Sequence, residues 1–230
     1  MLKIVLFGSG KMGRLIASIA SEKHQVLAQV SCKNDADELK SLVEPADVVI
    51  DFSHATCMLQ NIAICADLGK NMVIGTTGWD KDFPQAQNII LESQIGCIYE
   101  PNFSLGIHFF RKILSYTAQL SKLYPYYEMA GVEWHHSKKA DAPSGTAKML
   151  SEAAAPAALP FTSIRCGSIP GTHSIYLDSP CDTIVLTHEA RNREGFARGA
   201  IQAAEWIKGK RGLFTIDDLI NDLQKEDVCF

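Results

Sequence analysis

One stretch near the middle of the chain concentrates side chains suited to proton transfer and anion binding. Residues 133–147 read E-W-H-H-S-K-K-A-D-A-P-S-G-T-A, with two adjacent histidines and two lysines just before a Pro-Ser-Gly-Thr segment. An imidazole exchanges its proton near neutral pH, and a lysine ammonium donates a proton or holds an anion. This combination of residue types is typical of a site for a small anionic substrate.

The Pro-Ser-Gly-Thr segment predicts the start of a helix. An Ala-rich run follows it to about residue 155, and Ser144 has the short hydroxyl side chain preferred at a helix N-cap. The first N–H groups of a helix are unpaired and lie at the positive end of its dipole, so they bind carboxylates and phosphates. A solvated loop with an ordinary cap is the alternative, and the neighbouring histidines favour the anion site.

The N-terminal segment predicts a dinucleotide-binding turn. Lys3–Phe7 is a short apolar run, and a helix-forming run covers residues 14–20. Between them lies a G-x-G-x-x-G motif made of Gly8, Ser9, Gly10, Lys11, Met12 and Gly13. In this strand-turn-helix context the glycines permit the tight turn, the approach of a pyrophosphate, and close packing of helix on strand. A glycine-rich turn without a cofactor is the alternative.

The end of the next strand, expected at residues 26–30, bears on the choice between NADH and NADPH. An NAD-binding fingerprint places Asp or Glu here, but the chain continues S-C-K-N and its first acid is Asp35. Lys33 and the small Ser31 would instead suit the 2′-phosphate of NADPH. The sequence therefore favours NADPH on the strength of one lysine, and NADH stays open.

Alternating strands and helices up to residue 103 predict a parallel sheet. We expect strands at 47–52, 71–74 and 95–99, with helices at 37–43, 53–68 and 81–93. Ligands bind beyond the carboxyl ends of parallel strands, so the loops after two of these strands are further cofactor candidates. They supply Gly75, Thr76, Thr77, Glu100, Pro101, Asn102 and Phe103. Asn102 can bond the nicotinamide carboxamide or a ribose, whereas turn chemistry alone explains either loop equally well.

The pattern changes after Ser104. A helix is expected at 105–123 and a strand at 126–134, and the Ala-rich helix is followed by strands at 162–166, 173–177 and 183–190. Consecutive strands without intervening helices predict an antiparallel or mixed open sheet in a second, α+β domain. Helices at 196–207 and 215–223 complete the chain.

Composition narrows the class of protein. The 230 residues are 47% hydrophobic and 21% charged with a net charge of −4, so no basic surface for nucleic acid is indicated. We find no apolar run of the roughly 18 residues that a membrane span requires, and no signal peptide, and we expect a cytoplasmic protein. The seven dispersed cysteines form no C-x-x-C pair, which predicts reduced thiols and no metal site.

Taken together, these motifs resemble those of the dihydrodipicolinate (4-hydroxy-tetrahydrodipicolinate) reductase family. The resemblance covers nearly the whole chain, and its most specific part is the E-x-H-H-x-x-K-x-D-A-P-S-G-T-A string. Its other parts are Asp51-Phe52-Ser53, Gly75-Thr76-Thr77-Gly78, Pro101-Asn102-Phe103-Ser104, Gly167-x-x-Pro170-Gly171-Thr172-His173, His188-x-Ala190 and Phe196-Ala197-x-Gly199-Ala200.

The resemblance implies a Rossmann doubly wound parallel sheet in residues 1–103 and 196–230, and a substrate-binding and oligomerisation domain in residues 104–195. It also implies a homotetramer joined through the second domain's sheets. The turn after Phe7 is one residue shorter than the G-x-x-G-x-M-G of many members. The segment between Asn34 and Val48 is also shorter than in most members of the family. It contains no clear counterpart of the acidic-basic pair that binds the adenosine ribose.

The family reaction reduces a cyclic imine-type dicarboxylate with a nicotinamide hydride and loses water from the 4-hydroxy precursor. By resemblance, His135 donates or accepts a proton and Lys139 is a second proton donor, since Lys138 breaks the motif spacing. His136 would bind the substrate, with Gly145 and Thr146 holding a carboxylate beside Ser144. Another small-substrate Rossmann dehydrogenase, or a nucleotide-sensing protein without turnover, would not require the His-His-x-x-Lys string.

Overall fold

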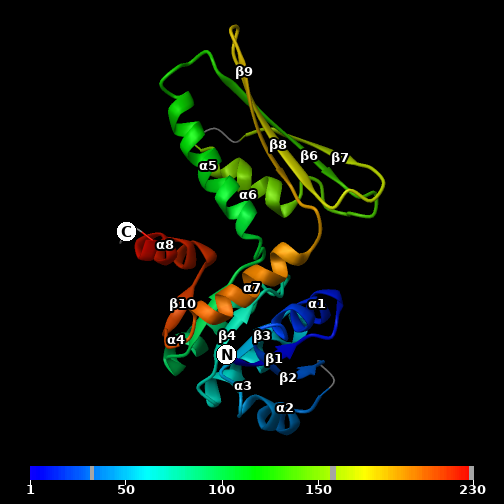
Figure 1. The fold of residues 1–230 in the computed structure, drawn as a ribbon, viewed down its shortest axis with the longest axis vertical. Helices are drawn as coiled ribbons and strands as arrows, with labels where there is room; N and C mark the ends of the chain where they lie inside the picture. Colours follow the sequence, from blue (N-terminus) through cyan, green and yellow to red (C-terminus); the bar gives the residue numbers. More distant parts are fainter. Residues whose placement is uncertain (32–33, 156–158, 228–230) are drawn as a thin grey trace. The chain divides into compact units, whose positions relative to one another are not determined.

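The computed structural model describes residues 1–31, 34–155 and 159–227, and the chain divides into two compact units (Figure 1). Unit 1 comprises Met1–Ser104 and Glu194–Phe230, and unit 2 comprises Leu105–Arg193. Lys33, on which the preference for NADPH depended, lies outside the described residues. The chain therefore builds most of unit 1, then all of unit 2, and then returns to unit 1.

Unit 1 is built on a six-stranded parallel sheet in the order β10-β5-β4-β3-β1-β2. Its strands are β1 (Lys3–Phe7), β2 (Gln25–Val30), β3 (Val48–Asp51), β4 (Asn71–Ile74), β5 (Gly96–Tyr99) and β10 (Gly212–Phe214). The strand order reverses at β1, as in a doubly wound sheet. This arrangement confirms the predicted Rossmann fold.

Helices cover the sheet of unit 1 in two groups. Helix α1 (Lys11–Ala20) packs against α7 (Glu194–Trp206), while α2 (Ala36–Val43), α3 (Met58–Asp67) and α4 (Phe83–Ser93) pack in series. Apart from Lys3 and Asn71 at their starts, the central strands β1, β3 and β4 are buried, as expected where helices cover both faces. The helix predicted at 53–68 begins as a 3₁₀ turn at Ala55–Cys57, and helix α8 (Ile216–Asp227) ends the chain.

Strand β10 was not predicted from the sequence. It has three residues, Gly212–Phe214, too few for an alternation of apolar and polar residues to be recognised, and it pairs with β5. Asn71 fixes this edge, because its Nδ2 donates to the carbonyl of Ile207 at 2.7 Å and its Oδ1 accepts from the N–H of Gly96 at 2.8 Å. Strand β10 of the C-terminal segment is thus part of the first sheet.

Unit 2 consists of a four-stranded mixed sheet and two helices. Its strands β6 (Glu128–His135), β7 (Phe161–Arg165), β8 (Thr172–Asp178) and β9 (Thr183–Glu189) lie in the order β7-β6-β8-β9. Only the β6–β7 pair is parallel. Helices α5 (Leu105–Ser121) and α6 (Gly145–Ala153) pack against one face of the sheet through Ile107, Leu114, Leu150, Ile175 and Leu177.

Within residues 1–31, 34–155 and 159–227, no helix is long and apolar enough to cross a lipid bilayer. Across the same residues, the cysteines are free thiols, namely Cys57, Cys65, Cys97, Cys166 and Cys181.

Candidate active site

The glycine turn in unit 1 has the geometry of a dinucleotide cradle. A Cβ on Gly13 would lie 1.9 Å from the carbonyl oxygen of Gly8, and a Cβ on Gly8 would lie 2.3 Å from that of Phe52. Gly10 differs, because no atom of the described residues comes within 4 Å of a Cβ built there. Gly10 is also the N-cap of α1, so the open side of the turn faces the helix N-terminus, where a pyrophosphate binds.

The other predicted cofactor loops lie at the same edge of the sheet. The N–H of Gly75 donates to the Asp51 carbonyl at 2.9 Å, and the N–H of Glu100 donates to the Ile74 carbonyl at 3.0 Å. The loops containing Gly75–Thr77 and Glu100–Phe103 thus follow the carboxyl ends of adjacent strands β4 and β5. The sheet brings both loops to the edge that carries the glycine turn.

Side chains in these loops divide into supporting and exposed groups. Thr76 is buried and its hydroxyl donates to Asp51 Oδ1 at 2.9 Å, whereas Thr77 is exposed. Phe103 is buried with its ring centroid 5.9 Å from that of Phe52, and Pro101 is exposed. Asn102 Oδ1 accepts from the Ser104 N–H at 2.9 Å. The side chains of Thr76 and Phe103 therefore pack into the protein and stabilise the loops.

Asp51, quoted above only as part of a motif, organises this edge. Its buried carboxylate accepts hydrogen bonds from the Ser53 N–H at 2.8 Å, Asn61 Nδ2 at 2.7 Å and the Thr76 hydroxyl. Burial raises the pKa of Asp51, and these hydrogen bonds lower it by less than burial raises it. The carboxylate thus joins the loops that follow β3 and β4.

Unit 2 gathers a second set of polar side chains on the helix-covered face of its sheet. Strand β6 alternates, so Glu133 and His135 lie on that face and Trp134 on the other. Register completes the group, since Glu133 pairs with Ser163 of β7 and with His173 of β8, and His135 pairs with Arg165 of β7.

The two oxygens of the Glu133 carboxylate have different partners. Oε1 accepts from three donors: the Ser144 N–H at 3.0 Å, the Ser163 hydroxyl at 2.7 Å and Arg165 Nη2 at 2.8 Å. Oε2 lies 3.4 Å from His135 Nδ1 and 3.5 Å from His173 Nε2. Burial alone would raise the pKa of Glu133, but the hydrogen bonds from Ser144, Ser163 and Arg165 outweigh it and lower that pKa to about 2.

Both imidazoles beside Glu133 are held toward the neutral form. Burial lowers the pKa of His135; Glu133 opposes this effect, while Lys139 and Arg165 add to it. Burial, and then His135, lower the pKa of His173 to about 4. Glu133, His135 and His173 also have the atom spacing of a metal site, but the Arg165 guanidinium already compensates the carboxylate charge. We therefore interpret the group as a proton-handling network.

Helix α6 begins where the sequence predicted. Ser144 is its N-cap, with the hydroxyl accepting from the Ala147 N–H at 3.1 Å. Lys139 Nζ lies 2.7 Å from Asp141 Oδ1 and is the main cause that lowers the pKa of Asp141, with smaller effects from the N–H groups of Asp141 itself and of Gly145. His136 is half-buried, and Lys138 is exposed. The structure thus groups Lys139, Asp141 and the α6 N-terminus, while Ser144 joins that helix end to Glu133.

Comparison with known proteins accounts for both halves of the chain. Residues 2–103 match the family model "Dihydrodipicolinate reductase, N-terminus", and residues 106–220 match "Dihydrodipicolinate reductase, C-terminus". The chain belongs to the dihydrodipicolinate reductase family. It is an oxidoreductase family whose N-terminal Rossmann domain binds NADH or NADPH.

Individual relatives agree with this assignment. A 4-hydroxy-tetrahydrodipicolinate reductase from Christiangramia forsetii is 33% identical, covering 97% of this chain and 100% of the relative. A dipicolinate-bound dihydrodipicolinate reductase from Paenisporosarcina sp. TG-14 superposes with a TM-score of 0.77 at 22% identity, over 94% of this chain and 97% of the other. A probable dehydrogenase from Thermotoga maritima, with a TM-score of 0.62 at 11% identity over 92% and 90%, shares the fold.

Sequence reasoning did not identify the partners of Glu133 in this member of the family. Ser163 and Arg165 belong to a strand whose alternation was read only as secondary structure, and His173 was quoted as part of a motif without a role. Alternation along β6 places Glu133 and His135 together, and the same rule applied to β7 and β8 places these three residues on a common face. Pairing of the strands was the missing information.

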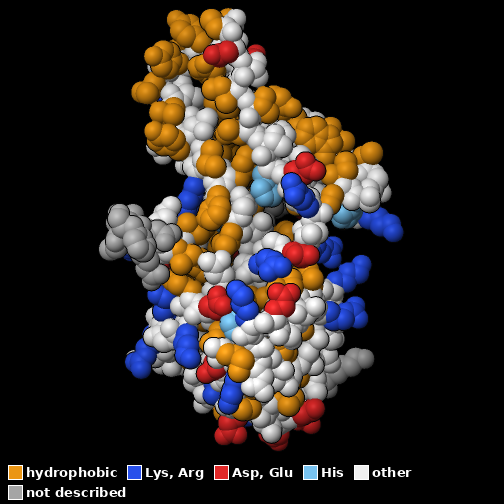
Figure 2. Space-filling view, viewed as in Figure 1, with side chains coloured by type: hydrophobic (Ala, Val, Ile, Leu, Met, Phe, Trp, Pro, Cys, Tyr) orange, Lys and Arg blue, Asp and Glu red, His pale blue; other side chains and the backbone are white. Residues whose placement is uncertain are grey.

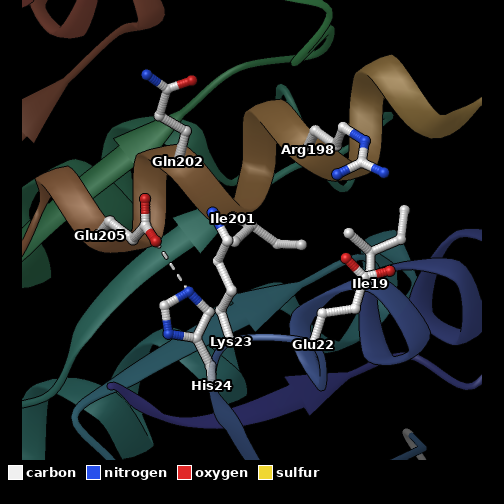
Figure 3. A pocket seen from close by; sticks show the side chains of 8 residues that line it. All are labelled: Ile19, Glu22, Lys23, His24, Arg198, Ile201, Gln202 and Glu205. Atoms are coloured by element: carbon white, nitrogen blue, oxygen red, sulfur yellow. Dashed lines mark ion pairs between the residues drawn. The ribbon is translucent and has the colours of Figure 1, made fainter.

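A hollow elsewhere in unit 1 contains none of the predicted site residues. Figure 3 shows it between α1 and α7, and it measures about 170 Å³. His24 lies beneath it with Nε2 2.9 Å from Glu205 Oε1, and its Nδ1 accepts from the Leu2 N–H at 3.2 Å. These contacts join the start of β1 to α7, so the hollow belongs to the packing of unit 1.

Proposed function

We propose that the chain reduces 4-hydroxy-tetrahydrodipicolinate to tetrahydrodipicolinate, in the diaminopimelate and lysine pathway, with NADPH or NADH. The observation that carries this proposal is the buried His135, supported by Glu133 and joined through Ser144 to the N-terminus of α6. The 33% identical relative has the same activity in its name, and the superposed Paenisporosarcina enzyme binds dipicolinate, a dicarboxylate.

Each part of unit 2 has a role in this reaction. Loss of the 4-hydroxyl group as water converts the substrate to a conjugated imine, and a bound nicotinamide would supply a hydride to one carbon of that imine. A proton must then reach another atom of the substrate, and His135 and Lys139 handle protons. His136 and the Gly145 and Thr146 backbone bind the substrate carboxylates at the α6 N-terminus, where Ser144 is the cap. Asp141 holds the Gly145 N–H and Lys139 in the absence of substrate and is displaced by it.

Substrate charge prepares His135 for its role. In the free protein, burial and the neighbouring cations keep its pKa low, so the ring is neutral at pH 7. An anionic substrate beside the ring favours the imidazolium and raises that pKa. Binding of the dicarboxylate therefore favours protonation of His135 in the substrate complex, where His135 donates its proton.

Unit 1 holds the cofactor in this proposal. The turn from Gly8 to Gly13, with Ser9, Lys11 and Met12, receives the pyrophosphate, and the loops of Gly75–Thr77 and Glu100–Phe103 line the nicotinamide half. Thr76 and Phe103 stabilise these loops and do not contact the cofactor with their side chains, because those side chains are buried. Ser31, after β2, lies where the adenosine ribose is bound in a Rossmann domain.

A spectrophotometric assay tests the reaction and the cofactor together. Enzymatically generated substrate is added with NADPH or NADH, and loss of absorbance by the reduced nicotinamide is followed. We expect turnover with at least one cofactor and a higher kcat/KM with NADPH. A strong preference for NADH would contradict the 2′-phosphate hypothesis, and absence of turnover with either cofactor would contradict the proposed function.

We also propose that four copies assemble through the outer face of the unit 2 sheet. Its central positions carry uncharged side chains: Val132, Trp134, Ile164, Tyr176 and Val185. Of these side chains, Ile164, Tyr176 and Val185 are exposed. Figure 2 also shows exposed hydrophobic side chains over α5, which packs on the other face of the sheet. A broad apolar surface of this kind is typical of an obligate interface.

Light scattering after size-exclusion chromatography tests the assembly. The protein is expected at four times its 25.2 kDa chain mass. Tyr176→Glu places a carboxylate at the centre of the face and should yield smaller species, whereas Lys122→Glu, a change in the α5–β6 connection, should not. A monomeric wild-type protein would exclude the tetramer.

A further inference from the structure

We propose that Glu133 is a positioning residue that holds the proton of neutral His135 on Nδ1 and so presents Nε2 to the substrate. The proposal rests on the proposed function for its kinetic consequences, but its structural content does not depend on that function.

The first step is that the orientation of the Glu133 carboxylate is fixed. Three donors converge on Oε1, from the Ser144 backbone, Ser163 and Arg165, and the side chain has no exposed surface. Rotation of the carboxylate would break these charge-assisted hydrogen bonds in a site without solvent to replace them. Oε2 is therefore always the oxygen that meets the imidazoles.

The second step concerns the proton on His135. His135 Nδ1 and Glu133 Oε2 lie 3.4 Å apart, and within the described residues both atoms are buried and neither has a hydrogen-bond partner. Because a carboxylate oxygen is negatively charged and only accepts hydrogen bonds, it favours the tautomer with hydrogen on the ring nitrogen that faces it. That nitrogen is Nδ1, which leaves the lone pair of the neutral ring on Nε2. Gly171 has no side chain to cover this end of the ring, because a Cβ there would lie 3.0 Å from Nε2.

The charged and titratable groups around His135 agree with this assignment. Glu133 and Asp141 favour its protonated form, whereas Lys139 and Arg165 oppose it. His173 meets the ring edge-on, with centroids 5.2 Å apart, and its Nε2 lies 3.3 Å from the Ser144 hydroxyl. The Glu133 carboxylate, 3.4 Å from Nδ1, is therefore the group to which we assign selection of the tautomer.

Glu133→Gln tests the proposal, because it replaces the oxygen that faces His135 Nδ1 with an NH₂ donor. The donors from Ser144, Ser163 and Arg165 require an acceptor, so the amide oxygen takes the place of Oε1 and the NH₂ group takes the place of Oε2. An NH₂ donor facing Nδ1 requires a lone pair there, which moves the proton to Nε2. The variant keeps the volume of the side chain and its bond to the α6 N-terminus while reversing the tautomer of His135.

The measurement is ¹⁵N NMR of histidine-labelled protein at pH 8.5, with His135 assigned by the signals missing in His135→Gln. We expect the Nδ1–H tautomer in the wild type and the Nε2–H tautomer in Glu133→Gln. Ser163→Ala is the matched control, since it removes one contact with Oε1 but should keep the Nδ1–H tautomer. A wild-type Nε2–H tautomer would overturn the proposal without any variant.

Kinetics then separate positioning from folding. We expect kcat of Glu133→Gln to fall at least 100-fold with the substrate KM changed less than threefold, because the anion site keeps its bond to residue 133. A kcat within threefold of the wild type would also overturn the proposal. If wild-type protein has the expected tautomer, reversed in Glu133→Gln, but does not turn over the substrate, the proposed function fails and the role of Glu133 stands.

Discussion

The candidate anion-binding sites of the two units are built from different groups. In unit 1 the candidate site is made of backbone: a turn whose glycines lie against carbonyl oxygens at the N-terminus of α1. In unit 2 it is made of side chains, arranged on a sheet around the buried Glu133 carboxylate. A backbone site holds a shape, whereas a side-chain site also controls where protons reside.

The two units also differ in the direction in which the pKa of a buried acid is shifted. Asp51 and Glu133 each accept several hydrogen bonds and are fully buried. Burial prevails at Asp51 and raises its pKa, while at Glu133 the hydrogen bonds, including one from Arg165, prevail and lower its pKa to about 2. The hydrogen bonds from Ser144 and Ser163 lower the pKa of Glu133 most, and the Arg165 guanidinium adds a cation, whereas the partners of Asp51 named above are uncharged.

The largest expected effect separates chemistry in unit 2 from cofactor binding in unit 1. His135→Gln should lower kcat by about 10²–10⁴-fold, the range for removal of a general acid or base. The dissociation constant for NADPH, measured by fluorescence titration, should change less than twofold. Near-normal turnover of the variant would exclude the role of His135 as the proton-handling residue.

The next effect tests the backbone site by comparing two glycines of the turn, Gly13 and Gly10. Gly13→Ala forces a Cβ to 1.9 Å from the Gly8 carbonyl oxygen, so overpacking should destabilise the fold by about 1–3 kcal/mol. Gly10→Ala meets no described atom within 4 Å and should unfold at nearly the wild-type temperature, yet its affinity for NADPH should fall at least tenfold. Equal cofactor affinity in Gly10→Ala and wild type would contradict the assignment of the turn.

Acid should destabilise unit 2 before unit 1. His173 has a folded pKa of about 4, below the 6.5 of an unfolded chain, so protonation of the unfolded form lowers stability as pH falls from 6.5 to 4. Glu133, depressed from 4.5 to about 2, adds a loss as pH falls below 4.5. Each amounts to about 3 kcal/mol when complete. The raised pKa of Asp51 acts oppositely, because its contribution is lost as pH rises.

Hydrogen exchange read by mass spectrometry checks this order. Peptides from β6 and β8 should lose protection between pH 7 and 4.5, after correction for intrinsic exchange, while peptides from β3 and β4 keep theirs. His173→Asn should reduce the loss above pH 4.5. Equal loss of protection in both units would contradict the contrast between the two buried acids.

The smallest effect concerns the exposed pair between Lys139 and Asp141. Asp141→Asn frees the ammonium and the Gly145 N–H, so a dianionic substrate no longer competes with the Asp141 carboxylate. Exposed ion pairs contribute about 0–1 kcal/mol, which corresponds to a substrate KM lowered up to about fivefold. The effect should shrink as salt is added. A raised KM would indicate that Asp141 instead supports the loop.

Much of this molecule follows from its sequence. The glycine turn, the Ser144 cap and the change of pattern after Ser104 are local features, and local rules predict them. Arg165 and Ser163 are brought to Glu133 by the parallel pairing of β6 with β7, and His173 by the antiparallel pairing of β6 with β8. Strand β10 was missed for the same reason, since three residues acquire their structure from β5 rather than from their own pattern.

The return of the chain to unit 1 also has a consequence for synthesis. Helix α7 packs so closely that a Cβ on Gly199 would lie 1.8 Å from the Phe103 carbonyl oxygen, and β10 completes the sheet at residues 212–214. A ribosome makes these segments after all of unit 2. Unit 1 is therefore begun before unit 2 and completed after it, and one face of its sheet lacks α7 while unit 2 is translated. Nascent chains halted before Glu194 should therefore be those most dependent on chaperones.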